Sequence, residues 1–274
     1  MRDQQDPEAG LQLRYIVDGN GPPLLLLHGL FDSAKTWDRL IPYLSSGFKL
    51  YAVDLPGFGK TPLPVHWDAS LSGMVDAVSG FLDLQGFSKV SLVGSSMGGG
   101  LALALSEKYP HRIDRLALLN PYGLPILPLA VKGARKPVIG RLLPYFMGGT
   151  AIKRCAKIIF LRALDDKTLL TEAMLDDRIQ AFRSLQGRKD LFRFLKGISL
   201  EEISKIDARL SDIRQPVLIL WGKKDGWLSE DHCLHLKKKL LQSRVIPIPD
   251  CGHLPHMEKP EAVAAAISDF CRTS

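Results

Sequence analysis

Residues 90–108 read VSLVGSSMGGGLALALSEK, and this stretch decides the fold. A short apolar run leads into GSSMG at 94–98, and a run of helix-forming residues follows from Leu101. Gly-x-Ser-x-Gly between a buried strand and a helix is typical of a sharp turn that lifts the central serine above a sheet. We therefore predict that Ser96 is a nucleophile and that the amino end of the next helix favours negative charge beside it.

Other apolar segments alternate with helical patterns on either side of this turn. Short buried strands are predicted at residues 24–28, 50–55, 90–93, 116–120 and 217–221, with a last strand at 245–249 and an early antiparallel edge strand at 14–17. Continuous apolar runs are typical of parallel strands that are covered on both faces. The sequence therefore predicts an α/β fold with a mostly parallel central sheet and helices on both faces.

The alternation of strand and helix patterns stops between Asn120 and Pro216, where helical patterns are interrupted by proline and glycine. The segment is too rich in leucine, phenylalanine and methionine for a solvated linker, so it must pack on something. We predict a core formed by residues 1–120 and 216–274, with 121–215 inserted as a helical lid over the mouth of the site.

Composition narrows the class of protein. Of the 274 residues, 46% are hydrophobic and 24% are charged, as in ordinary globular proteins. The first ten residues are polar and lack the apolar stretch of a secretory signal, and the longest apolar runs are too short to span a bilayer, so we expect a cytoplasmic protein. The cysteines show neither zinc-site nor disulfide spacing: Cys155, Cys233, Cys251 and Cys271. No metal or organic cofactor is expected.

A serine nucleophile needs an imidazole base held by a carboxylate. In chain order, Asp225 follows the strand at 217–221 and His253 follows the last strand, so both fall in loops at the carboxyl ends of strands. His256 is the rival base, because it lies only three residues further on. Asp250 and Asn120 compete for the acid position, although an asparagine cannot carry the charge that stabilises imidazolium.

The loop that follows the strand at 24–28 is predicted to complete the site. Backbone N–H groups of Leu30 and Met97 would form an oxyanion hole, and whether Leu30 or Phe31 supplies the first of them is left open. We interpret His28 itself as structural.

These motifs resemble, in order, the landmarks of the α/β-hydrolase superfamily. The resemblance is carried by HGLFDS, VDLPGFGKT, GSSMGG, WGKKD and GHLPHMEKPE, and it covers nearly the whole chain outside the lid. It is specific for the fold and the catalytic triad, and within the superfamily it is similar to carboxylesterases and monoacylglycerol-lipase-like enzymes. The resemblance gives Asp54 a role in shaping its loop.

The resemblance implies a serine ester hydrolase that acts on a small to medium apolar ester through an acyl-enzyme. Two alternatives stay open. One is a carbon–carbon bond hydrolase of a ring-cleavage product, although relatives of that kind usually show Gly-Pro-Gly near the oxyanion loop, Asn before the nucleophile and Trp after the histidine, where this chain has residues 31–33, Ser95 and Leu254. The other is a slow-turnover receptor on the same fold.

The net charge of +7 arises largely from one segment. Nine basic residues and no acidic one lie between Arg115 and Leu164: Arg115, Lys132, Arg135, Lys136, Arg141, Lys153, Arg154, Lys157 and Arg162. Nucleic acid is not expected as a partner, because no recognition module accompanies them. A helix at 152–160 would separate apolar from basic residues, so weak attachment to an anionic membrane is an alternative to the favoured interpretation, a lid helix packed on the core.

Overall fold

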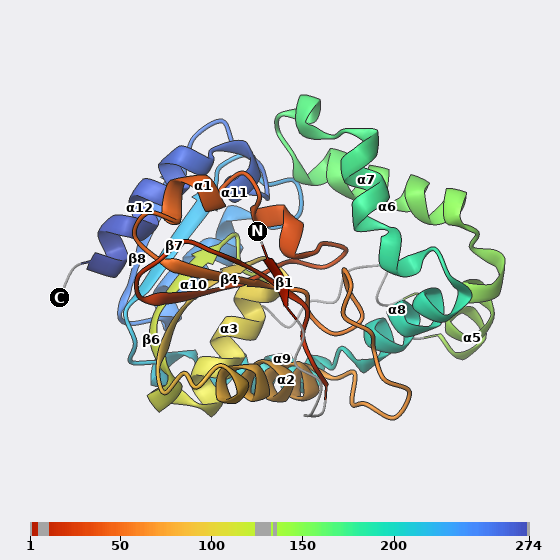
Figure 1. Cartoon of the computed structure of the whole chain (residues 1–274), viewed down its shortest axis with the longest axis horizontal. Coiled ribbons are helices and arrows are strands. Elements are labelled where there is room, and N and C mark those ends of the chain that lie inside the picture. Colours follow the sequence, from red (N-terminus) through yellow and green to blue (C-terminus); the bar gives the residue numbers. More distant parts are fainter. Residues whose placement is uncertain (1, 5–10, 124–132, 134–135, 273–274) are drawn as a thin grey trace.

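The computed structural model describes residues 2–4, 11–123, 133 and 136–272, and its centre is an eight-stranded sheet (Figure 1). The spatial order is β1-β2-β4-β3-β5-β6-β7-β8. The strands are β1 (Arg2–Gln4), β2 (Tyr15–Asp18), β3 (Pro23–Leu27), β4 (Lys49–Val53), β5 (Val90–Ser95), β6 (Ile113–Leu119), β7 (Val217–Gly222) and β8 (Ser243–Ile248). Strands β3 to β8 run parallel, which confirms the predicted mostly parallel sheet.

The predicted edge position of the segment at 14–17 is wrong. Strand β2 is antiparallel, as predicted, but β1 pairs outside it with Arg2 opposite Val17. A strand of three polar residues has no apolar alternation to reveal it in the sequence, because its pairing rests on backbone hydrogen bonds.

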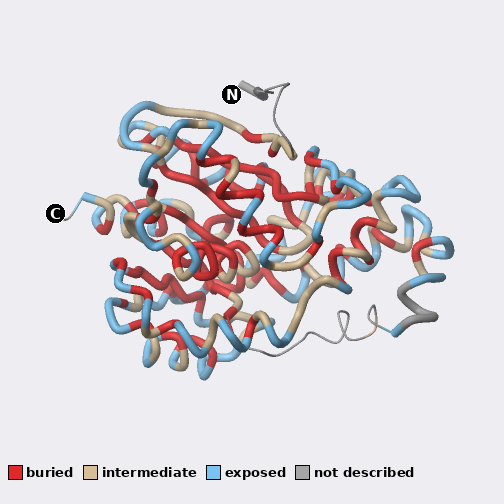
Figure 2. The backbone as a smooth tube through the Cα atoms, turned by 90° about the horizontal axis from the view of Figure 1, so that it is seen from below, coloured by how far each residue is buried: buried red, intermediate tan, exposed pale blue. Residues whose placement is uncertain are grey.

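Side chains that alternate between the two faces of the sheet divide the core into two layers. In β3, Leu24 and Leu26 belong to one apolar cluster and Leu25 and Leu27 to the other, and all four are fully buried. Successive side chains of a strand point to opposite faces, so an all-apolar strand needs cover on both sides. The buried centre of the chain is visible in Figure 2.

Helices provide that cover. Helices α1 (Ile41–Leu44) and α12 (Pro260–Arg272) pack on the face of Leu24, and α11 (Pro255–Glu258) leads into α12. Helices α2 (Leu71–Leu84), α3 (Met97–Lys108) and α10 (Glu230–Lys239) contribute to the cluster on the opposite face. Single-turn 3-10 helices are η1 (Ala34–Trp37), η2 (Pro110–Arg112), η3 (Lys167–Leu169), η4 (Gln180–Phe182) and η5 (Leu210–Asp212).

The segment between β6 and β7 contains helices of two kinds. Helices α5 (Pro137–Phe146), α6 (Gly149–Ala163), α7 (Glu172–Arg178) and α8 (Leu185–Gly197) stand to one side of the sheet (Figure 1), with α5 packed on α8 and α6 on α7. Helix α9 (Leu200–Arg209) packs instead against α3 of the core. We use "lid" below for α5 to α8; residues 124–132 and 134–135 of the proposed insertion lie outside the described residues.

The lid is bound to the loop after β3 by charge and by aromatic packing. Arg178 of α7 forms an ion pair with Asp32, and both side chains are buried. Next to this pair, Asp177 accepts from Lys35 Nζ at 2.5 Å. The Phe182 ring meets Phe31 edge-on, with ring centroids 5.6 Å apart. The lid therefore contacts the core through both charged and aromatic side chains.

The basic face of the lid is partly neutralised. Lys153 Nζ lies 2.8 Å from Glu172 and 2.9 Å from Asp176, while Lys157 Nζ lies 3.7 Å from Glu172. Ile152 is buried on the opposite side of α6. Lys132 and Arg135 of the basic segment lie outside the described residues.

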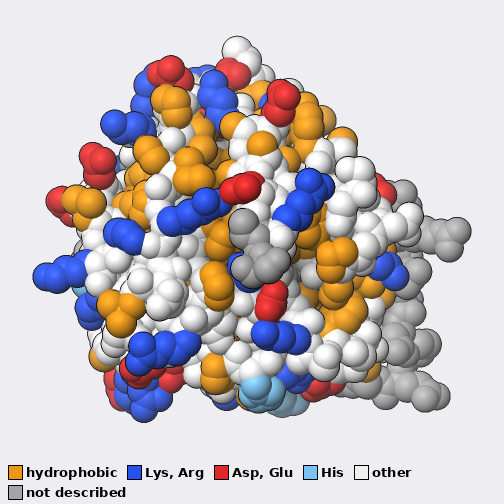
Figure 3. Space-filling view, turned by 90° about the vertical axis from the view of Figure 1, so that its left-hand side faces the viewer, with side chains coloured by type: hydrophobic (Ala, Val, Ile, Leu, Met, Phe, Trp, Pro, Cys, Tyr) orange, Lys and Arg blue, Asp and Glu red, His pale blue; other side chains and the backbone are white. Residues whose placement is uncertain are grey.

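The surface carries both charges. On the face shown in Figure 3, lysine and arginine side chains are interspersed with aspartate and glutamate. None of the helices in the described part of the chain is long and apolar enough to cross a membrane.

Candidate active site

Ser96 lies in a strained turn between β5 and α3. Its φ of 50° and ψ of −115° place a non-glycine residue in a rarely populated backbone region. Close packing forces the turn: a Cβ on Gly94 would lie 2.5 Å from Gly98 O, and one on Gly98 would lie 2.1 Å from Leu27 O. Small residues at both positions let strand and helix approach, so the serine side chain projects from the carboxyl end of the sheet.

The acid and the base meet although 28 residues separate them. Asp225 lies in the loop after β7 and His253 in the loop after β8. His253 Nδ1 and Asp225 Oδ2 are 2.7 Å apart, and the two side chains are 8% and 1% exposed. A buried carboxylate at this distance fixes the imidazole tautomer and leaves Nε2 free to take a proton.

Further hydrogen bonds hold the Asp225 carboxylate. Oδ1 accepts from Trp227 N at 2.7 Å and Leu228 N at 3.0 Å, and Oδ2 accepts from Asn120 Nδ2 at 2.6 Å. Burial opposes ionisation of Asp225, but the hydrogen bond and charge of His253 and the two backbone N–H groups outweigh it and lower the pKa of the carboxyl group. Asp225 is therefore ionised at neutral pH, as an orienting acid must be.

No hydrogen bond joins Ser96 and His253, both of which lie in the described part of the chain. Catalytic hydrogen bonds are often long before substrate binds and tighten only in the reacting complex. Asp225 and His253 are thus paired in this structure, while no hydrogen bond is formed between the described residues His253 and Ser96.

The predicted oxyanion loop lies beside the nucleophile. A Cβ on Gly29 would lie 3.3 Å from Ser96 Cβ, so the backbone after β3 passes directly over the serine. Among the described residues, no acceptor binds the N–H of Leu30, Phe31 or Met97. Met97 is the first residue of α3, whose amino-terminal N–H groups have no partners within the helix. Phe31, with φ at 60°, remains an alternative donor to Leu30.

The alternative candidates His256 and Asp250 form contacts with other residues. His256 is fully buried, with Nε2 2.8 Å from Thr36 Oγ1 and its ring 4.4 Å from that of Trp37. Burial, with smaller contributions from Arg178 and His253, lowers the pKa of His256 to about 3, so it stays neutral. The Asp250 carboxylate is exposed and binds Lys224 Nζ at 2.8 Å.

Asn120 is not an alternative acid but a partner of Asp225. Its Nδ2 donates to the carboxylate, its Oδ1 accepts from Gly222 N at 3.0 Å, and its side chain is fully buried with φ at 41°. Sequence reasoning missed this role. The available signal was its place directly after β6, where a polar residue faces the loop that follows β7.

Two buried polar residues shape the loops around the site. His28 Nε2 accepts from Leu55 N at 3.0 Å, and its Nδ1 donates to Gly29 O at 2.8 Å, as expected of a structural histidine. The Asp54 carboxylate accepts from Ala34 N at 2.6 Å and Lys60 N at 2.8 Å, which fits the loop-shaping role that the resemblance implies.

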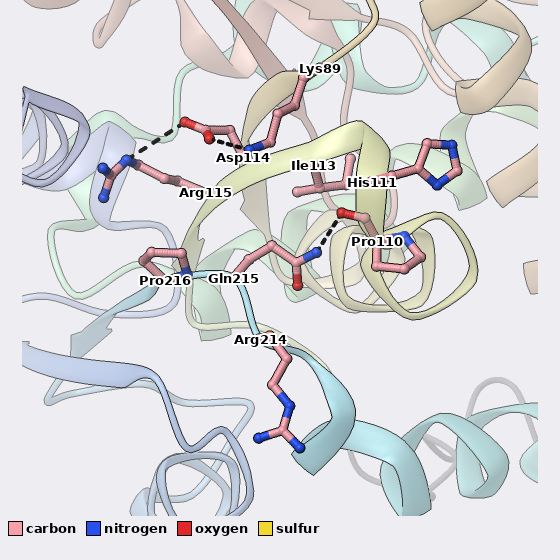
Figure 4. A pocket seen from close by; sticks show the side chains of 9 residues that line it. All are labelled: Lys89, Pro110, His111, Ile113, Asp114, Arg115, Arg214, Gln215 and Pro216. Atoms are coloured by element: carbon pink, nitrogen blue, oxygen red, sulfur yellow. Dashed lines mark hydrogen bonds and ion pairs between the residues drawn. The ribbon is translucent and has the colours of Figure 1, made fainter. Parts of the chain in front are cut away.

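A surface depression of about 420 Å³ lies away from these residues (Figure 4). Its lining comes from the segments that precede β5 and β7 and from the first residues of β6, with Lys89, Gln215 and Asp114 among them. This is the amino end of the parallel strands, opposite the edge that carries Ser96. Open α/β sheets build their sites at the carboxyl ends, so this depression is separate from the candidate site.

Within the described residues, no three His, Cys, Asp or Glu side chains lie together in a way that could hold a metal ion. The site thus consists of a serine, an acid–base pair and backbone N–H groups, a constellation typical of acyl-transfer hydrolases.

The chain belongs to the family of the alpha/beta hydrolase fold, which its residues 22–260 match. It is an enzyme of the hydrolase class, in keeping with its relatives.

The chain is similar to individual hydrolases: a dienoate hydrolase, a meta-cleavage product hydrolase and an esterase. The 2-hydroxy-6-oxo-6-phenylhexa-2,4-dienoate hydrolase of Comamonas testosteroni is 29% identical over 268 residues, covering 95% of this chain and 91% of the relative. A crystal structure of a meta-cleavage product hydrolase has a TM-score of 0.81 at 24% identity and covers 96% and 95% of the two chains, which shows a shared fold. A thermophilic esterase from Thermogutta terrifontis has a TM-score of 0.80 at 27% identity, covering 95% and 93%.

Proposed function

We propose that Ser96 attacks a substrate carbonyl while His253 takes its proton and Asp225 stabilises the resulting imidazolium. The tetrahedral oxyanion is held by the N–H groups of Leu30 and Met97, and water then releases the acyl group from the serine. The Asp225–His253 pair, 2.7 Å apart and buried beside a strained serine turn, supports these assignments.

For the substrate we propose, first, a 6-oxo-dienoate whose carbon–carbon bond is hydrolysed. The observation that carries this choice is the similarity of almost the whole chain to the dienoate hydrolase of Comamonas testosteroni. Attack of Ser96 on the 6-oxo carbon would form the new C–O bond, and the adjacent carbon–carbon bond would break. The substrate would react as its 2-oxo tautomer, in which C5 has taken up a proton, so that the electron pair of the broken C5–C6 bond passes through the C3–C4 double bond to the 2-oxo group. The resulting dienolate then takes up a proton. The comparisons favour this reaction over ester hydrolysis.

A neutral apolar ester is the second candidate, and one contact in the structure favours it. A dienoate carries a carboxylate that needs a cationic partner when water is excluded. Arg178 is a buried guanidinium next to the oxyanion loop, but Asp32 and Asp177 already neutralise it. The chain also departs at residues 31–33, Ser95 and Leu254 from the pattern usual in carbon–carbon bond hydrolases. The similarity to the Thermogutta terrifontis esterase supports the same candidate.

Paired assays separate the two substrates. The purified chain would be mixed with 2-hydroxy-6-oxo-6-phenylhexa-2,4-dienoate, following loss of the dienoate absorbance, and with aryl esters of increasing acyl length. A kcat/KM for the dienoate at least about a hundredfold above that for the best ester supports carbon–carbon bond hydrolysis, and the reverse ratio supports the esterase.

The nucleophile is tested independently of the substrate. A fluorophosphonate probe should label the wild type and Ser95→Ala but not Ser96→Ala, and Ser96→Ala should lose at least about a thousandfold in turnover. An adduct found on Ser95 would overturn the assignment.

A further inference from the structure

Glu258, at the end of α11, binds three backbone N–H groups with one carboxylate. Oε1 accepts from Gly252 N at 2.9 Å, the residue that directly precedes His253. Oε2 accepts from Asp165 N at 2.7 Å and Asp166 N at 2.9 Å, just beyond the end of lid helix α6. A single side chain therefore joins the histidine loop to the lid.

The backbones of these two segments also meet directly. His253 N donates to Ala163 O at 2.6 Å, and Ala163 is the last residue of α6, whose carbonyl has no partner within the helix. A Cβ on Gly252 would lie 2.3 Å from the same carbonyl oxygen, so no side chain can separate the two segments. The position of the helix end thus fixes the position of the histidine backbone.

The loop that carries the acid rests on the same helix end. Arg162 Nε donates to Gly226 O at 2.6 Å, and Trp227 Nε1 donates to Ile159 O at 3.2 Å. The Arg162 guanidinium also stacks over the Trp227 ring at 4.8 Å. Gly226 and Trp227 directly follow Asp225, so the last turn of α6 contacts both loops whose side chains form the acid–base pair.

From these contacts we propose that Glu258 is a positioning residue, which sets His253 against Asp225 and Ser96 by binding the histidine loop to the end of α6. This inference rests on the proposed roles of Ser96 and His253. Displacements of about 1 Å in a catalytic group cost orders of magnitude in rate, so loosening this junction should slow the chemical step. The lid then acts on the reaction through the backbone of the base, in addition to covering the site.

Glu258→Gln tests the proposal with the smallest change in shape. The amide places an NH₂ group among three N–H donors and removes the charge, so at least one side of the junction must open. Glu261→Gln is the matched control, because Glu261 is exposed in the first turn of the neighbouring α12. We expect Glu258→Gln to lower kcat and the fluorophosphonate labelling rate about 10- to 100-fold, with KM changed less than about threefold. Glu261→Gln should match the wild type.

Labelling rates are compared at a temperature where circular dichroism shows each variant folded, across a range of pH. A folded Glu258→Gln that is labelled at the wild-type rate would show that the residue stabilises the fold only, and would overturn the proposal. If Glu258→Gln does not fold, Glu258→Asp keeps the charge but is too short to reach both segments, so the same rate loss is expected of it and a wild-type rate again overturns the proposal. A wild type that resists labelling at Ser96 would refute the proposed function instead.

Discussion

Asn120 Nδ2 donates at 2.6 Å to Asp225 Oδ2, the same oxygen that lies 2.7 Å from His253 Nδ1. Asp225, in the loop after β7, thus contacts both Asn120 at the end of β6 and His253 in the loop after β8. The Asn120 amide makes this contact without adding a second negative charge, which would raise the pKa of one carboxyl group of the pair.

Replacing Asn120 should separate its two hydrogen bonds. Asn120→Ala removes both, and leaves Gly222 N without its acceptor, so we expect about 1–3 kcal/mol lower stability and about tenfold or more lower kcat/KM. Asn120→Asp keeps the acceptor for Gly222 but loses the donor to Asp225. At pH 8 it should not recover the rate, because it brings a second buried negative charge against Asp225. Thermal unfolding measures the stability of each variant, and ester or dienoate turnover measures its rate. Equal rates in Asn120→Asp and wild type would contradict a role for the hydrogen bond from Asn120 to Asp225.

His256 should make the fold sensitive to acid. Burial lowers its pKa from 6.5 to about 3, so the unfolded chain binds a proton at a pH where the folded chain does not. Stability from this residue is complete above about pH 6.5 and falls as the pH drops toward 3, by up to about 1.4 kcal/mol per pH unit. Buried His232, with its pKa lowered to about 4, adds a similar slope.

Denaturant unfolding between pH 7.5 and 4.5 would measure this slope. His256→Phe keeps a ring against Trp37 and should give a shallower loss of stability with acid than the wild type, even if it is less stable at pH 7.5. His66→Gln, at an exposed position, serves as the control and should follow the wild-type slope. Parallel curves for His256→Phe and wild type would rule out His256 as a source of the acid sensitivity.

The buried pair of Asp32 and Arg178 should be costly to break from one side. Arg178→Met leaves an uncompensated buried carboxylate and is expected to lower the free energy of unfolding by about 3–5 kcal/mol. Asp32→Asn combined with Arg178→Met should be more stable than Arg178→Met alone, because neither charge remains. Arg183→Met, which removes an exposed partner of Asp176, should have little effect. If the change in the free energy of unfolding of the double variant equals the sum of the changes in Asp32→Asn and Arg178→Met alone, the two charges are not coupled.

Membrane attachment through the lid remains a testable alternative. Because Lys153 and Lys157 are paired with Glu172 and Asp176, we expect the wild type to stay in the supernatant with anionic vesicles at both low and high salt. Co-sedimentation at low salt that is lost in a Lys153→Ala, Arg154→Ala, Lys157→Ala variant would instead support an electrostatic attachment.

The elements that sequence could predict are those with a local signal. The turn at Ser96 shows itself through its glycines, and the buried parallel strands through their unbroken apolar runs. Asp225 and His253 were placed by their position after such strands, and the structure brings them together. The sequence marks Asn120 only as a possible acid, because its place directly after a strand does not show which group its amide contacts.

What sequence could not predict depends on distant partners. Glu258 binds N–H groups 92 and 93 residues away, and Arg178 pairs with Asp32 far along the chain. Neither contact leaves a periodicity or spacing to detect. The strand at 2–4 could not be predicted for a related reason, because its pairing is made by backbone groups alone.

The junction between α6 and the loops after β7 and β8 also orders events during synthesis. A ribosome completes the lid before the last strands, so the carbonyl groups at Ile159 and Ala163 emerge about 60 to 90 residues ahead of the donors that bind them. Nascent chains arrested before residue 217 would hold the serine turn but neither acid nor base. We therefore expect the nascent chain to be inactive on the ribosome. It should gain activity only when the residues from 217 onward have folded against a lid that is already present.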